Sequence, residues 1–114
     1  MVEIHTREEQ DTFVVELEGR LDAFHAPTVR DALIRAVEQG HIKIAVDLAK
    51  VTFMDSTGLA ALVAGMFRAR EQGGDLRLAC VREPVCVIFE LTHMDTTFVL
   101  TDNVGAAIES FSEA

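Results

Sequence analysis

One stretch in the middle of the chain constrains the fold more than any other, because an apolar segment there runs into Asp55-Ser56-Thr57-Gly58 and an amphipathic pattern follows. Residues 42–48 are rich in Ile, Val and Leu, as in a parallel strand that is covered on both faces. From Leu59 onward apolar residues recur with helical spacing up to Gly73-Gly74, a pair typical of a helix end. Asp55 or Ser56 is predicted to cap this helix, which spans about 17 residues.

The remaining pattern alternates short β-prone and amphipathic segments. Strands are expected over residues 2–6, 13–17, 42–48, 75–81 and 97–100, with a polar turn over residues 7–11. The other helices are expected from Pro27 to Gly40, from Pro84, and after a cap at Asp102 or Asn103. The predicted fold is one α/β domain over residues 1–114. It has the order ββαβαβαβα, about four helices, and a mixed, mostly parallel sheet of about five strands with one antiparallel edge.

Composition narrows the possible functions. The net charge is −9 with 10 Lys and Arg residues in no basic cluster, which disfavours binding to nucleic acid. No apolar run approaches the ~20 residues of a membrane span, and the start of the chain has no signal-peptide pattern, so a cytoplasmic protein is expected. The histidines are scattered, the two cysteines are not spaced as C-x-x-C, and no phosphate-binding G-x-x-x-x-G-K is present. No metal or cofactor is predicted.

Two loops follow the expected second and third strands, at residues 19–25 and 53–58. If these strands pair in parallel, Asp22 and Ser56 lie at the same end of the sheet, where ligands and partners of such folds bind. Asp22 either caps the first helix region or lines a pocket there. Ser56 is either a helix cap or a hydroxyl placed at the positive end of a helix dipole, where a phosphoryl group is favoured. Thr57 is the competing acceptor.

The helix after this turn has a second face besides its core stripe of Leu59, Leu62, Val63, Met66 and Phe67. Steps of four from Ser56 reach Ala60, Ala64 and Arg68, flanked by Ala61 and Gly65. Alanine is the best helix former, so this face is one that solvent alone could cover. It is equally a flat surface on which another protein could approach Ser56 closely.

Three segments together resemble the bacterial anti-sigma factor antagonists, which are single-domain proteins of the STAS class. They are Gly19-Arg20-Leu21-Asp22, the strand at residues 44–48, and residues 51–59 with the sequence VTFMDSTGL. The resemblance implies that Ser56 is phosphorylated by a serine kinase that is also the anti-sigma factor and has a histidine-kinase-like ATPase fold. It implies that the unmodified antagonist binds this kinase and frees a sigma factor. It also implies that the phosphorylated antagonist releases the kinase, and that a metal-dependent serine phosphatase then restores the unmodified form. Ala60 departs from the pattern, because members often carry a further glycine there.

The resemblance therefore implies a switch without catalytic activity of its own. Ser56 is the expected phosphate acceptor, with Asp22 and Asp55 shaping its pocket, Thr57 and Gly58 forming the helix start, and Ala60, Ala64 and Arg68 forming the docking face. One alternative is a constitutive STAS scaffold or adaptor subunit without phosphorylation. Another is a small enzyme or nucleotide-binding protein that uses the Asp55-Ser56 turn, although the sequence lacks the G-x-S-x-G turn of hydrolases.

Overall fold

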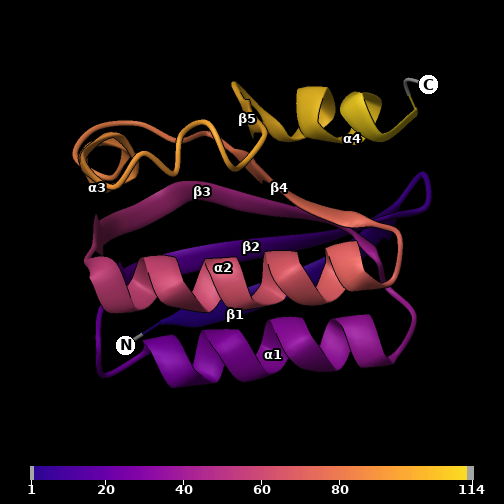
Figure 1. Cartoon of the computed structure of the whole chain (residues 1–114), viewed down its shortest axis with the longest axis horizontal. Coiled ribbons are helices and arrows are strands. Elements are labelled where there is room, and N and C mark those ends of the chain that lie inside the picture. The colour runs from indigo at the N-terminus through magenta and orange to yellow at the C-terminus, as the bar shows by residue number, and fades with distance from the viewer. Residues whose placement is uncertain (1, 113–114) are drawn as a thin grey trace.

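The computed structural model describes residues 2–112, and their helices and strands follow the predicted order (Figure 1). The strands are β1 (Glu3–Glu9), β2 (Thr12–Leu21), β3 (Lys43–Met54), β4 (Asp75–Ala79) and β5 (Leu100–Thr101). The helices are α1 (Ala26–Glu38), α2 (Ser56–Glu71), α3 (Cys86–Leu91) and α4 (Val104–Ser112).

The strands form one sheet with the order β1-β2-β3-β4-β5. β1 is antiparallel to β2, and the other neighbours are parallel, so the predicted fold class is confirmed. Helices α1 and α2 lie side by side on one face of the sheet, and α4 lies on the other (Figure 1). Within the described residues, no helix combines the length and apolar character needed to cross a bilayer.

The larger part of the core lies between the sheet and the α1–α2 pair. Strand residues such as Leu17 and Val46 are fully buried there against Leu33 and Met66 from the helices. Gly65 lets the two helices approach, because a Cβ at this position would lie 3.0 Å from the Leu33 side chain. Small residues, among them Ala45, Ala79 and Ala107, fill the thinner layer under α4.

The strands around the expected turns are longer than predicted. β2 continues to Leu21 and β3 to Met54, because register shifts between Glu16 and Glu18 and between Gly19 and Arg20 let the pairing resume beyond each irregularity. The predicted polar turn at residues 7–11 is also too long. β1 extends to Glu9, and only Gln10 and Asp11 have the positive φ angles of a tight turn, 51° and 66°.

The second half of the chain differs in boundaries and in one core residue. β4 ends at Ala79, before the positive φ of Cys80; α3 begins at Cys86 rather than at Pro84; and β5 is shifted to Leu100–Thr101. Phe67 was predicted to lie in the core, but 57% of it is exposed. It lies one turn after Val63, which is itself only half-buried, at the margin of the apolar stripe.

Candidate functional site

The candidate site lies where β2 and β3 end. Leu21 pairs with Met54, and the next residue, Asp55, donates its backbone N–H to the Leu21 carbonyl at 3.4 Å. Because the two strands are parallel neighbours, Asp22 and Ser56 leave the sheet at the same end. This prediction from the sequence is confirmed, and it places both loops beside the start of α2.

Asp55, rather than Ser56, caps α2. One carboxylate oxygen of Asp55 accepts the backbone N–H groups of Thr57 at 3.0 Å and Gly58 at 3.1 Å. The same oxygen accepts the Thr57 hydroxyl at 2.5 Å. The Asp55 side chain therefore satisfies the first free amides of the helix and also occupies the hydroxyl of the residue that competes with Ser56 as an acceptor.

Ser56 is the first residue of α2, and its side chain is exposed. Within residues 2–112 its hydroxyl has no hydrogen-bond partner. The hydroxyl stands at the amino end of a 16-residue helix, where the helix dipole favours negative charge. The two neighbouring hydroxyls thus differ in their hydrogen bonding, since that of Thr57 is bound to Asp55 and that of Ser56 is free to contact solvent or a partner.

Asp22 caps the turn that leads from β2 into α1. Its Oδ1 accepts the backbone N–H groups of Phe24 at 3.1 Å and His25 at 3.2 Å, and it lies 2.7 Å from the His25 Nδ1. Its Oδ2 lies 3.5 Å from the Arg20 Nε. His25 occupies the N-cap position of α1 itself without a side-chain cap bond. The Asp22 carbonyl also accepts the backbone N–H groups of His25 at 3.1 Å and Ala26 at 2.8 Å, so the predicted alternative of a cap on the first helix region is confirmed, at the turn that precedes α1.

Local hydrogen bonds keep both carboxylates ionised. The Thr57 hydroxyl is the largest influence on Asp55 and lowers its pKa, assisted by the Gly58 and Thr57 amides, while partial burial and the Asp22 charge act in the opposite direction. At Asp22, partial burial raises the pKa, but the hydrogen bonds and charge of His25 outweigh it and leave the pKa lowered. The two carboxylates lie close enough for the Asp22 charge to raise the Asp55 pKa. Two negative charges therefore stand near Ser56.

A groove of about 370 Å³ runs along α2 next to this site. Small side chains make up most of its wall, and Arg30 supplies a cation. Its lining residues are Ala23, Ala26, Pro27, Arg30, Thr57, Ala60, Ala61 and Ala64. The structure thus brings Ala60, Ala64 and Thr57 together, whereas Arg68 lies outside the lining with its Nε 4.0 Å from Glu71. Of the two residues predicted to flank this face, Ala61 lines the groove although it is 2% exposed, and Gly65 is buried toward Leu33 and Leu76.

Exposed apolar side chains surround the same end of the sheet, and the sequence reasoning missed them. Phe24, in the loop after Asp22, is 86% exposed, and Leu91 on α3 is 73% exposed. A second hollow of about 210 Å³ lies between the end of β3 and α3, where it is lined by Phe53, Met54, Pro84, Val87, Ile88 and Leu91. The exposure of Phe24 could have been inferred from the sequence, because it stands in a loop between Asp22 and His25. The exposure of Leu91 could not, because it depends on how α3 packs against the rest of the domain.

The two cysteines have the environment of unreactive thiols. Cys80 is buried and Cys86 is half-buried. Burial raises the pKa of both thiols above their usual value, and nearby acidic side chains raise them further. Nucleophilic cysteines need the opposite shift, so neither residue has the setting of a catalytic thiolate.

Comparison with known proteins agrees with this arrangement. The STAS domain family matches residues 3–107. The anti-sigma-B factor antagonist of Bacillus subtilis (strain 168) is 30% identical over 93 residues, covering 82% of this chain and 84% of the relative.

Two solved structures have the same fold. An anti-sigma factor antagonist from Mycobacterium paratuberculosis superposes with a TM-score of 0.86 at 23% identity, covering 99% of this chain and 96% of the other. SpoIIAA, a Bacillus cell fate determinant solved in its phosphorylated form, gives a TM-score of 0.74 at 20% identity, with 95% and 98% covered. The chain belongs to the STAS domain family. Within that family it is similar to the anti-sigma factor antagonists.

Proposed function

We propose that this chain is an anti-sigma factor antagonist and that phosphorylation of Ser56 switches its binding to an anti-sigma factor that is also a serine kinase. The observation that carries the proposal is the unequal treatment of two adjacent hydroxyls. Asp55 holds the Thr57 hydroxyl at 2.5 Å, while Ser56 is exposed at the amino end of α2. Both residues are exposed, so the proposed acceptor is the hydroxyl without a hydrogen-bond partner in the described part of the chain, that of Ser56.

The unmodified chain offers an uncharged hydroxyl at Ser56 and a low-relief surface beside it. Ala60 and Ala64 lie along the groove wall and leave room for a partner's backbone or side chains to approach closely. Exposed Phe24 and Leu91 supply apolar area at the same end of the molecule. An exposed apolar surface with a polar rim is the usual composition of a protein-binding site, so the anti-sigma factor is proposed to dock here.

Phosphorylation changes the charge of this surface rather than the fold. A phosphoserine adds about −1.5 to −2 charges at neutral pH. The amide groups at the start of α2 tolerate that charge, but Asp22 and Asp55 already make the neighbourhood negative. A partner surface suited to a neutral hydroxyl must then take up a concentrated negative charge and strip its water, so the complex dissociates. A serine phosphatase returns the chain to its binding form.

In the transfer itself the chain is the substrate. The Ser56 oxygen forms a bond to the γ-phosphorus of ATP, the bond from that phosphorus to ADP breaks, and the hydroxyl proton passes to a base of the kinase. The chain is proposed to have no catalytic role, and Asp55 and Asp22 act by holding the two loops in position.

The test combines mass spectrometry with binding measurements. The chain is incubated with ATP and with each candidate anti-sigma serine kinase of its own genome, and the modified site is mapped. One phosphoryl group is expected on Ser56 in the wild type and in Thr57→Val, and none in Ser56→Ala. Modification that disappears in Thr57→Val but persists in Ser56→Ala would assign the acceptor to Thr57 instead.

Binding of the kinase decides whether the modification acts as a switch. Ser56→Asp is expected to weaken the complex at least tenfold while Ser56→Ala keeps it, with unchanged circular dichroism in both variants. Equal binding by Ser56→Asp and the wild type contradicts the electrostatic mechanism. Stable complexes without modification by any kinase identify the chain as a constitutive scaffold.

A further inference from the structure

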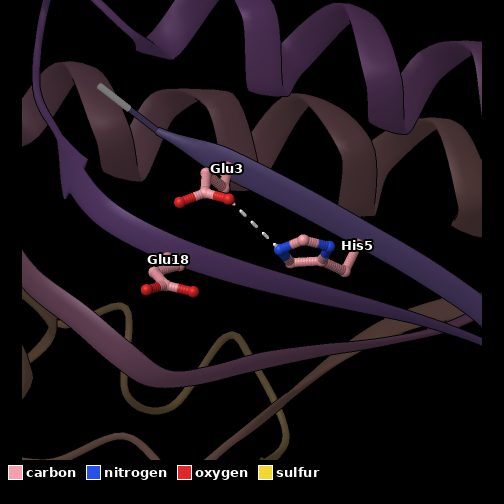
Figure 2. A group of neighbouring side chains, drawn as sticks. All are labelled: Glu3, His5 and Glu18. Atoms are coloured by element: carbon pink, nitrogen blue, oxygen red, sulfur yellow. Dashed lines mark ion pairs between the residues drawn. The ribbon is translucent and has the colours of Figure 1, made fainter.

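Three side chains with metal-binding atoms converge on the opening hairpin, away from Ser56. Glu3 lies directly opposite Glu18 in the β1–β2 ladder, and His5 follows Glu3 by two residues, so it projects from the same face of the strand. Figure 2 shows the three side chains gathered over this part of the sheet, with the His5 imidazole pointing toward Glu3. One ligand atom from each lies within 4.8 Å of the others.

Two negative charges face each other at this position. Glu3 and Glu18 are a cross-strand pair of like charges, an arrangement that destabilises a ladder. The Nε2 of His5 lies 3.6 Å from a Glu3 oxygen. Lys50 lies opposite Glu18 in the β2–β3 ladder, but its ammonium group contacts Glu16, at 3.4 Å. Within residues 2–112 no lysine or arginine forms an ion pair with Glu3 or Glu18. A bound cation would remove the repulsion between the two carboxylates.

We propose that Glu3, His5 and Glu18 bind a divalent transition-metal ion of the Zn²⁺ type. Ligand atoms around a tetrahedral ion with ~2.1 Å bonds are about 3.4 Å apart. The Glu3–His5 distance of 3.6 Å is already close to that value. Glu3 and His5 are each 57% exposed at the side chain, so small rotations can bring the set into coordination.

The donor set also selects the kind of ion. One imidazole nitrogen with two carboxylate oxygens suits Zn²⁺, Co²⁺, Ni²⁺ and Cu²⁺, whereas Mg²⁺ and Ca²⁺ prefer oxygen ligands alone. Three protein ligands leave the remaining positions to water. The ion would link β1 to β2 immediately before residues 19–22, and because it binds the paired hairpin it would stabilise the folded chain.

Calorimetric titration with ZnCl2 tests the proposal, using the full chain without a polyhistidine tag. The chain has no Trp or Tyr, so heat and NMR shifts replace intrinsic fluorescence as signals. One ion per chain is expected, with amide shifts concentrated in β1 and β2. His5→Ala should weaken binding at least tenfold, and Glu18→Gln several-fold. The matched control is His93→Asn, which removes another exposed imidazole and keeps a residue type that tolerates the φ of 60° there.

Thermal unfolding followed by circular dichroism provides a second readout. Zn²⁺ should raise the midpoint of the wild type and of His93→Asn, but not that of His5→Ala. The absence of a binding isotherm in the wild type overturns the proposal. So does equal binding by His5→Ala, which would place the ion on other groups such as Cys86.

Discussion

The Leu21 carbonyl oxygen lies against the α-carbon of Gly58, at the point where β2 ends and α2 begins. A Cβ at Gly58 would fall well inside van der Waals contact with that oxygen and 2.8 Å from the Leu21 side chain. The contact joins the loop that carries Asp22 to the helix that carries Ser56. Glycine at this position therefore sets the separation of the two halves of the site.

Gly58→Ala is expected to destabilise the chain. The added methyl group forces α2 away from the end of β2, and overpacking of this kind costs about 1–3 kcal/mol. Urea unfolding followed by circular dichroism measures the change. Gly105→Ala is the control, because a Cβ there meets only the Asn103 side-chain oxygen, at 3.3 Å, and alanine is a better helix former than glycine, so its effect should be smaller than that of Gly58→Ala. An unchanged free energy of unfolding in Gly58→Ala would contradict this prediction, because it would mean that the end of β2 can move away from α2 without cost.

Asp55→Ala is expected to lower the free energy of unfolding by about 1 kcal/mol at neutral pH, because α2 loses its cap. The folded-state pKa of Asp55 is lowered, so its contribution is complete above the unfolded pKa of about 4 and is lost as pH falls through the folded value. Urea titrations at about pH 7 and about pH 3 should therefore show the gap between wild type and variant shrinking in acid. Ser56→Ala, which leaves the cap intact, should show no such pH dependence.

Arg77→Met is expected to loosen α4. The Arg77 guanidinium donates to the buried Asp75 carboxylate at 3.1 Å and to the Ser110 carbonyl at 2.7 Å, and it lies 4.4 Å from the Phe111 ring centroid. Losing these contacts should cost about 1–3 kcal/mol. Hydrogen exchange should accelerate most in α4. The exposed Arg68→Met is the control and should stay within about 0.5 kcal/mol of wild type. Unchanged exchange in α4 would mean that its apolar contacts suffice.

Ala60→Arg is expected to weaken binding of the anti-sigma partner at least tenfold without altering the fold. Ala60 is exposed on the groove wall, so a long side chain there obstructs the approach to Ser56 at no cost to the core. Gln39→Arg adds the same charge at the far end of α1 and should bind normally. Surface plasmon resonance compares the two variants. If both bind as wild type does, the docking face lies elsewhere.

The order of the helices and strands could be predicted because the spacing of apolar residues within each segment indicates its secondary structure. The strand at residues 42–48, the cap residue at 55 or 56, and the stop at Gly73 are all signals contained within a few residues. The shared end of Asp22 and Ser56 followed from the pairing of two consecutive strands. These features need no knowledge of distant contacts.

The remaining features depend on tertiary pairing. β2 reaches Leu21 only because its pairing with β3 resumes after two shifts in register. No local sequence pattern predicts these shifts. The cluster of Glu3, His5 and Glu18 matches no metal-binding motif in the sequence, because the hairpin brings Glu18 beside residues that lie far earlier in the chain. The groove likewise needs Arg30 of α1 beside Ala60 of α2, a juxtaposition that helix packing alone creates.

The outer strand of the sheet has a consequence for the behaviour of the chain at high concentration. β1 lies at one edge, and five of its seven residues are Glu, His or Arg. A second molecule that added itself along this edge would bring its own charged strand against these side chains and displace their water. Charged edges of this kind suppress strand-to-strand aggregation. The charged edge should therefore keep the chain from aggregating through β1 even at high concentration.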